Sequence, residues 1–396
     1  MASGLHRRAQ SSSRRLRRLI CVCCGAPGNE AEPRMRTRVP DTGRRASPAP
    51  QIRDPYFCRS RNRIVLAHDR ARLQDARYRM HDMDQRPTPS TDGISVFVTA
   101  PDGLRLHVRE YGDRTGMPVV CLPGLSRTAA DFEPLAAALV SDPQRPRWVL
   151  ALDYRGRGLS DYDRNPGNYT LTVELEDLLA VLEARAVRPA VFIGTSRGGL
   201  LTMVLAAVRP NAIAGAILND VGPVIESKGL MRIKGYVGKL PLPRTYDEGA
   251  EILRRLFDAQ FTALDDDGWR AFARRTWREE NGRLVPSYDA NLAQALAAVD
   301  PEHPLPVMWA QFDALARVPM MVIRGANSDL LSAETVVQMR ARRSNLEVVE
   351  VPDEGHAPLL ADALTIGRIA GFVALCEKKA VRDLPRTAPE EPPSES

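Results

Sequence analysis

The chain has 396 residues, enough for one large domain with additions or for two domains. Its 44% hydrophobic and 26% charged residues are typical of globular proteins, and no apolar run of about 18 residues predicts a membrane-spanning helix. The formal net charge of +6 arises in residues 1–83, which hold nineteen arginines, no lysine and seven acidic residues, so the remainder is mildly acidic. We therefore expect no nucleic-acid partner for the folded part.

Residues 1–88 are rich in Arg and Pro without a sustained apolar period, and we predict that they are disordered. Three explanations compete: a transit or export signal, a basic tail that touches anionic membrane surfaces, or a segment absent from the native protein. We favour the third, because fifty arginines against five lysines indicate a GC-rich coding sequence and Met80 and Met83 are alternative starts. N-terminal sequencing tests this, and deleting residues 1–79 tests the membrane role through fractionation.

The six cysteines indicate neither a metal site nor a disulfide framework. Cys21, Cys23 and Cys24 are too close in sequence to share one tetrahedral metal, whereas Cys121 and Cys376 lie in apolar surroundings typical of a core. The expected location is therefore the reducing cytoplasm, with no metal and no organic cofactor.

Organised sequence begins near Ile94 with a hairpin signal, since two alternating segments flank Asp102-Gly103. Strands and helices then alternate up to residue 223. The predicted strands are 118–122, 147–152, 190–193 and 213–218, and the predicted helices are 127–140, 172–184 and 197–208. This alternation predicts an α/β fold with a mostly parallel central sheet flanked by helices, whose first part spans residues 89–223.

The alternation stops after Asn219–Pro223, and residues 224–316 are expected to form an inserted helical cap. Its predicted helices are 246–258, opened by a capping box at Thr245, then 266–280, 287–298 and 306–315. The second part of the core, residues 317–378, is predicted to contain strands at 320–324 and 346–351 and helices at 333–342 and 359–376. Residues 379–396 are rich in Pro and acidic residues and are predicted to be disordered.

The segment Gly194-Thr195-Ser196-Arg197-Gly198 lies between a predicted strand and a predicted helix. This is the placement of a nucleophile elbow, in which a sharp turn exposes the seryl oxygen at the carboxyl end of the sheet. Small residues at such a turn let the strand and the helix approach closely. We therefore predict that Ser196 is a nucleophile.

A nucleophilic serine needs a base, and the chain has six histidines. Three of them lie within residues 1–88, His107 lies inside a predicted strand, and His303 lies in a Pro-rich part of the insertion. His356 follows the last predicted strand in V-P-D-E-G-H-A-P, where its loop can reach the edge of the sheet that carries Ser196. We predict that His356 is the base.

The base needs an acid that fixes its tautomer. Asp329 is our choice, because it follows the strand 320–324 and completes the chain order Ser, Asp, His. Asp220, after the preceding strand, is the rival, whereas Asp353 shares the short loop of His356 and would approach it poorly.

An oxyanion hole needs two N–H donors. The backbone N–H of Arg197, directly after the nucleophile, is expected to supply one. The second is expected from Leu125 in V-C-L-P-G-L-S-R-T, where Gly124 permits a close turn after the strand.

With these motifs in order, the chain resembles the α/β-hydrolase superfamily of serine hydrolases with an inserted helical cap. The resemblance covers about residues 94–376 and rests on L-P-G-L-S, D-Y-R-G-R-G-L-S-D, G-T-S-R-G-G, R-G-A-N-S-D and E-G-H-A-P. Two positions depart from the usual pattern. Pro123 stands where many relatives have His, which leaves backbone donation intact, and Arg197 stands where relatives often have an apolar or amide residue, so its side chain is interpreted as structural.

The resemblance implies hydrolysis of a small or medium carboxylic ester or lactone through an acyl-enzyme on Ser196, in a monomer or homodimer. Trp309 and Phe312 are the predicted pocket-lining residues, since their segment runs directly into the strand before Asp329. Ser196 argues against epoxide hydrolases and haloalkane dehalogenases, which use an aspartate at the elbow. A carbon–carbon bond hydrolase, a cofactor-free perhydrolase and a non-catalytic ligand receptor remain alternatives, because the same residues and fold serve all of them.

Overall fold

The computed structural model describes residues 91–297, 299–300, 302 and 305–382. The predictions of disorder for residues 1–88 and 383–396 lie outside these ranges, as does His303. Residues 379–382, which were also predicted to be disordered, instead belong to the helix Ala363–Arg382. The strands are β1 (Ile94–Thr99), β2 (Arg105–Tyr111), β3 (Pro118–Leu122), β4 (Trp148–Leu152), β5 (Ala190–Thr195), β6 (Ile213–Asn219), β7 (Trp277–Glu280), β8 (Arg283–Pro286), β9 (Met320–Gly325) and β10 (Glu347–Val351). The α-helices are α3 (Glu133–Val140), α4 (Leu171–Ala184), α5 (Arg197–Val208), α6 (Ser227–Tyr236), α7 (Tyr246–Phe257), α8 (Asp266–Thr276), α9 (Trp309–Ala314), α10 (Ala333–Arg342) and α11 (Ala363–Arg382). Short 3-10 helices are η2 (Ala129–Phe132), η3 (Pro166–Asn168), η4 (Pro210–Ala212) and η5 (Ala290–Leu296).

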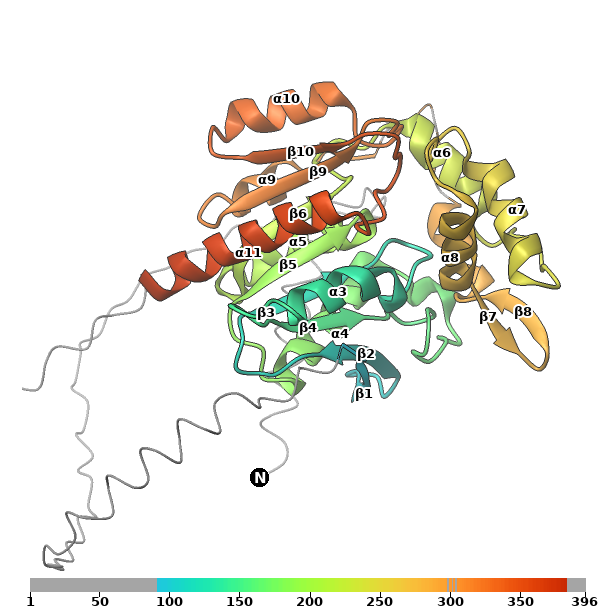
Figure 1. Cartoon of the computed structure of the whole chain (residues 1–396), viewed down its shortest axis with the longest axis horizontal. Coiled ribbons are helices and arrows are strands. Elements are labelled where there is room, and N and C mark those ends of the chain that lie inside the picture. The colour runs from blue at the N-terminus through green and yellow to red at the C-terminus, as the bar shows by residue number, and fades with distance from the viewer. Residues whose placement is uncertain (1–90, 298, 301, 303–304, 383–396) are drawn as a thin grey trace, which may run out of the picture. The chain divides into compact units, whose positions relative to one another are not determined.

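An eight-stranded sheet forms the centre of the fold, with strand order β1-β2-β4-β3-β5-β6-β9-β10 (Figure 1). The pairs β1–β2 and β2–β4 are antiparallel, and the strands from β4 through β3, β5, β6 and β9 to β10 are parallel. The predicted mostly parallel sheet and the hairpin at Asp102-Gly103 are therefore confirmed. Because crossover connections carry helices, both faces of the parallel part are covered.

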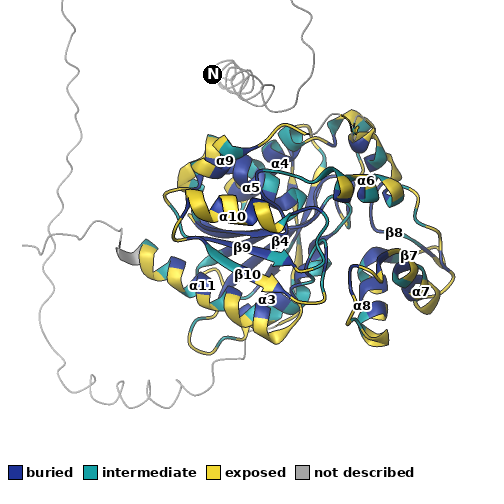
Figure 2. Ribbon diagram, turned by 90° about the horizontal axis from the view of Figure 1, so that it is seen from above, coloured by how far each residue is buried: buried dark blue, intermediate teal, exposed yellow. Residues whose placement is uncertain are grey.

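The strand pleat divides the core between the two faces of the sheet. On β3, Val120 and Leu122 pack in the layer with α4, α5, α9 and α10, whereas Val119 and Cys121 pack with α3 and α11. This alternation follows from the period of two in a strand, and near-continuous apolar runs are what a sheet buried on both faces requires. Figure 2 shows the buried strands between helices that expose only their outer sides.

The insertion between β6 and β9 forms its own small core, in which α7 and α8 pack against the β7–β8 hairpin. In Figure 1 these elements and α6 form a separate group beyond the ends of the strands that carry the loops after β5 and β6. Among the cap helices, α7 begins as predicted, with Thr245 Oγ1 accepting from the Glu248 N–H at 3.2 Å.

The insertion differs from the sequence-based expectation in four places. Helix α6 was not predicted, and the predicted helix 287–298 is the shorter 3-10 helix η5. The predicted helix 266–280 ends at Thr276, because the chain turns at Asn281-Gly282, where both residues have positive φ, into the β7–β8 hairpin. The helix α9 at the end of the predicted cap range 224–316 packs against α5 of the α/β layer instead of the cap core. The sheet and the cap core together leave a cavity, described next, at the carboxyl ends of β3 and β5.

Candidate active site

Ser196 lies on the sharp turn between β5 and α5, with φ 51° and ψ −112°. A positive φ is strained for a residue with a side chain, and such strain persists only where the surroundings enforce it. The neighbouring glycines allow the close approach of strand and helix that enforces this turn. A Cβ on Gly198 would lie 2.1 Å from the carbonyl oxygen of Leu122, and a Cβ on Gly194 would lie 2.4 Å from the carbonyl carbon of Gly198. The segment thus has the strand–turn–helix geometry that its sequence predicts.

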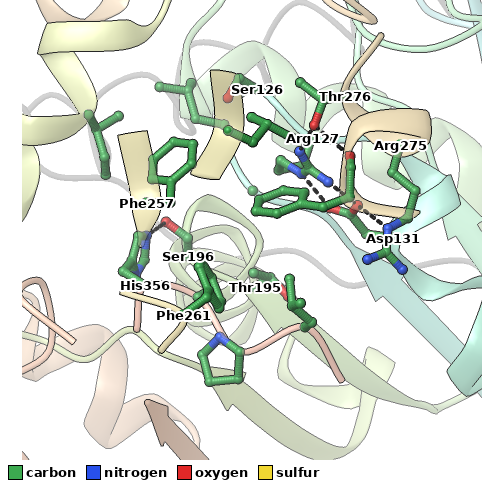
Figure 3. Close-up of a pocket in the computed structure, with 18 of the residues that line it drawn as sticks. Ser126, Arg127, Asp131, Thr195, Ser196, Phe257, Phe261, Arg275, Thr276 and His356 are labelled. Carbon is green, nitrogen blue, oxygen red and sulfur yellow. Dashed lines mark hydrogen bonds and ion pairs between the residues drawn. The ribbon is translucent and has the colours of Figure 1, made fainter. Parts of the chain in front are cut away.

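The side chain of His356 bridges Ser196 and an aspartate. Its Nε2 lies 2.9 Å from Ser196 Oγ (Figure 3). Its Nδ1 lies 2.8 Å from Asp220 Oδ2. Because a carboxylate only accepts hydrogen bonds, Nδ1 carries the proton and Nε2 is free to accept the seryl proton. From the cap, Gln260 Oε1 accepts the backbone N–H of His356 at 2.8 Å and fixes the loop that carries the ring.

The acid beside His356 is Asp220, so the prediction of Asp329 is wrong. Asp220 directly follows β6, as Ser196 directly follows β5, and these strands are neighbours in register up to Thr195 and Asn219. The Asp220 side chain is fully buried, where Gly325 N–H and Ser328 Oγ also donate to it at 2.9 and 2.6 Å. These donors hold the carboxylate in place and compensate its burial.

Asp329 binds a cap helix instead. Arg232 on α6 donates to both of its carboxylate oxygens, at 2.7 and 2.8 Å. The bend after β9 carries Asp329 past the sheet edge to the start of α6, where the Gly229 N–H donates to its carbonyl oxygen. Burial would raise the pKa of Asp329, but the hydrogen bonds and charge of Arg232 outweigh it and hold that pKa below its usual value of 3.8. Asp329 therefore joins the cap to the core.

A second Ser–His–Asp chain lies at the other end of the sheet. His107 Nδ1 lies 2.7 Å from Asp153 Oδ2, and its Nε2 lies 2.9 Å from Ser95 Oγ. Ser95 is exposed on the edge strand β1 and lines none of the described cavities, and Asp153 also accepts the N–H groups of Ala129 and Leu159. This chain of bonds joins β1, β2 and the loop after β4.

Of the two expected oxyanion donors, Leu125 lines the space beside Ser196, and Arg197 directly follows Ser196 at the start of α5. A Cβ on Gly124 would lie 3.9 Å from Ser196 Cβ, so the loop after β3 passes beside the seryl side chain. The Arg127 N–H donates to Gly124 O at 3.2 Å and closes a turn with Leu125 at its second position, and Arg157 Nε holds Leu125 O at 2.8 Å. The Leu125 and Arg197 N–H groups donate to no described residue. Both groups therefore stay available to a ligand oxygen, and their oxyanion role remains a prediction.

The Arg197 side chain turns away from this space. Its Nε donates to Glu174 Oε2 at 2.6 Å and its guanidinium also donates to Tyr169 O at 3.2 Å. Glu174 is fully buried and pairs with Arg157 as well, at 2.9 Å. The structural interpretation of this side chain is thus supported.

A cavity of about 100 Å³ adjoins Ser196 and His356. Cap side chains form much of its apolar wall. These are Ile233, Tyr236, Leu240, Leu253, Phe257, Phe261 and Phe272. Trp309 and Phe312 do not line it, and their prediction as pocket residues is wrong. Phe312 is fully buried in the core layer with α5, and the Trp309 ring lies under the Arg342 guanidinium at 4.2 Å.

Polar groups that the sequence reasoning did not single out lie at one side of the cavity. Arg127, Asp131, Arg275 and Thr276 gather there, whereas Ser196 and His356 lie at the other side (Figure 3). Arg127 follows L-P-G-L-S directly, so its position next to a predicted oxyanion loop was a usable signal.

Within the described part of the chain, no three His, Cys, Asp or Glu side chains are grouped as metal ligands. The described helices also include none with the length and apolar character needed to cross a membrane.

Comparison with known proteins agrees with this geometry. A 3-hydroxybutyrate-oligomer hydrolase of Cupriavidus necator is 33% identical over 280 residues, which cover 68% of this chain and 94% of that protein. An esterase of Mycobacterium tuberculosis is 25% identical over 53% of this chain and 68% of its own length. The crystal structure of an alpha/beta hydrolase from Novosphingobium aromaticivorans is 42% identical, with a TM-score of 0.67 over 72% of this chain and 98% of that one. Residues 119–366 match the alpha/beta hydrolase family, and the chain is a member of that family of hydrolytic enzymes.

Proposed function

We propose that this protein is a serine hydrolase that cleaves a small carboxylic ester or lactone through an acyl-enzyme on Ser196. The observation that carries the proposal is the chain of hydrogen bonds from Ser196 Oγ through His356 to Asp220, which opens onto a cavity. A serine is a weak nucleophile until a base takes its proton, and the base works best when an acid fixes its tautomer.

The reaction follows from these positions. His356 Nε2 removes the proton of Ser196 as the seryl oxygen attacks the substrate carbonyl, and the buried Asp220 carboxylate stabilises the imidazolium that forms. The N–H groups of Leu125 and Arg197 receive the negative oxygen of the tetrahedral intermediate, each worth on the order of 100- to 1000-fold in rate. His356 then protonates the leaving alcohol, and water, activated by the same ring, releases the acid.

The lining of the cavity supports a small substrate. Its wall is mostly aliphatic and aromatic, and its volume of about 100 Å³ suits a short acyl or alcohol chain unless the cap moves. The relatives from Cupriavidus necator and Mycobacterium tuberculosis are named for the hydrolysis of hydroxybutyrate oligomers and for esterase activity. Both names fit ester cleavage better than the carbon–carbon, perhydrolase or receptor alternatives.

The test is hydrolysis of p-nitrophenyl acetate, butyrate and octanoate by the wild-type protein and by Ser196→Ala. We expect a burst of p-nitrophenol from the wild type, a preference for the short chains, and loss of turnover in the variant. Thr195→Ala is a matched control, because it changes the neighbouring hydroxyl on the same turn while Ser196 and His356 remain. Equal rates in wild type and Ser196→Ala would remove Ser196 as the nucleophile.

A further inference from the structure

The guanidinium group of Arg275, which lines the cavity, has no hydrogen-bond partner among the described residues. Arg275 lies on α8 with 13% of its side chain exposed, and its Nε is buried without a hydrogen bond. Its nearest described ion-pair contact is Asp131 Oδ1, 3.8 Å from Nε, which is too far for a hydrogen bond. Buried guanidinium groups are normally held by several acceptors, so unused donors that face a cavity indicate space for an acceptor of another molecule.

The nearby carboxylate is already used by another arginine. Asp131 accepts two hydrogen bonds from Arg127, at 2.7 Å from Nε and 2.5 Å from a terminal nitrogen. Arg127 also donates to Thr276 Oγ1 at 2.8 Å, and its guanidinium lies 4.7 Å from the centre of the Phe272 ring. Among the side chains that line this side of the cavity, two arginines therefore face one aspartate.

Two other carboxylates act on Arg275 through space, but each has its own partner. Glu133 pairs with Arg109, and Glu354 Oε2 accepts the Leu359 N–H at 2.8 Å. Burial lowers the pKa of Arg275 and the charge of Arg127 adds to this, although Asp131 opposes both. Arginine side chains stay protonated in proteins, so this guanidinium remains a cation. Its site thus favours an incoming anion.

The helix that carries Arg275 is firmly packed. Phe272 and Ala273 are buried in the cap core, and Thr276 is buried next to Arg127. The backbone at Arg275 is therefore fixed before a ligand arrives, which lowers the cost of binding. Arg274, the next residue on the same helix, is exposed, lies outside this cavity and contacts the Tyr246 ring.

We propose that the cavity binds esters that also carry a free carboxylate, with Arg275 as the anion-binding residue. This inference rests on the proposed function, since the same molecule places its ester carbonyl at Ser196 and its carboxylate at the arginine. A guanidinium binds a carboxylate through two parallel N–H···O bonds, which adds geometric selectivity. Water adds across the acyl C–O bond, so the products are a carboxylic acid, which loses its proton, and an alcohol, and one of them retains the original carboxylate.

The experiment compares charged and neutral isosteres. One pair, 3-acetoxybutyrate and 3-acetoxybutyramide, carries the group on the alcohol part, and the other, monomethyl succinate and methyl succinamate, carries it on the acyl part. We expect the kcat/KM ratio of carboxylate to amide to be roughly tenfold to hundredfold for at least one pair, chiefly through KM. Arg275→Gln should bring that ratio near one, Arg275→Lys should keep part of it, and Arg274→Gln should retain the wild-type ratio.

Binding separates this inference from the proposed function. Calorimetry with the Ser196→Ala protein measures binding without turnover. It should show tighter binding of the preferred carboxylate than of its amide, and adding Arg275→Gln should abolish the difference. Carboxylate-selective binding without Ser196-dependent p-nitrophenyl acetate hydrolysis would support the anion site and refute the serine-hydrolase function. Ser196-dependent hydrolysis with ratios near one for both pairs would keep the function and refute the anion site. A preference that survives Arg275→Gln would also refute it.

Discussion

Replacing Asp220 by Asn tests which acid serves His356. In the structure the Gly325 N–H donates to Asp220 Oδ1 and His356 Nδ1 lies at Oδ2. The fixed N–H of Gly325 would select the amide oxygen of Asn, so the amide NH₂ would face His356. Nδ1 must then accept, and the proton moves to Nε2, where it points at Ser196. The ring in this tautomer cannot take the seryl proton.

The expected loss in kcat is about 10⁴-fold, the size seen when a triad aspartate is replaced by Asn in a serine protease. It corresponds to about 5 kcal/mol of transition-state free energy. Asp329→Asn should reduce kcat by less than about tenfold, because Asp329 acts on His356 only through space while binding Arg232. The assay is steady-state hydrolysis of p-nitrophenyl acetate.

Urea unfolding of both variants provides the control. Asn at position 220 keeps the bond to Gly325, so the protein should remain folded at the assay temperature. A loss of 10³-fold or more in Asp329→Asn, together with nearly full activity in Asp220→Asn, would refute the assignment and restore the acid that the sequence favoured.

Three more changes test other parts of the structure. Leu125→Pro should lower kcat about 100- to 1000-fold, whereas Leu125→Ala should keep most of the activity. Leu125 is the second residue of a hydrogen-bonded turn and its φ is not positive, so Pro fits there but offers no N–H. Equal rates in the two variants would exclude the Leu125 N–H as an oxyanion donor. In urea unfolding, Gly198→Ala should destabilise the fold by about 1–3 kcal/mol, since its Cβ would meet the Leu122 carbonyl. Gly371→Ala is the control on the helix α11, where a Cβ has open space, and it should stabilise the fold by about 0.5–1 kcal/mol. Asp329→Asn should be less stable than wild type at pH 7, and the difference in unfolding free energy should shrink as the pH falls below 3.8. The lowered pKa of Asp329 stabilises the folded state only at a pH where this carboxyl is ionised in the unfolded chain. A difference that grew on acidification would contradict the pair with Arg232.

The sequence by itself determined the sheet, the turn that carries Ser196 and the residue proposed as the base. Short, nearly continuous apolar runs, separated by helical segments, predict the parallel strands to within a residue or two of those observed, because the pattern reflects local backbone geometry. Ser196 and His356 could be found because each follows a predicted strand and such strand ends meet at one edge of the sheet. The hairpin at Asn281-Gly282 was equally local, and its turn dipeptide was a signal that could have predicted it.

The acid and the pocket were decided by the tertiary structure. Asp220 and Asp329 both follow strands and both give the order Ser, Asp, His, so chain order could not separate them. Asp220 lies one residue beyond β6, beside the Ser196 turn, whereas Asp329 lies four residues beyond β9 and meets Arg232, 97 positions away in sequence. Trp309 and Phe312 precede the strand before Asp329 but belong to α9, which packs on α5. Asp131 makes its hydrogen bonds to Arg127, so Arg275 has only a longer ion-pair contact with it. Periodicity and spacing in the sequence indicate which helix or strand a residue belongs to. The partner of a buried charge depends instead on which elements the packed fold brings together.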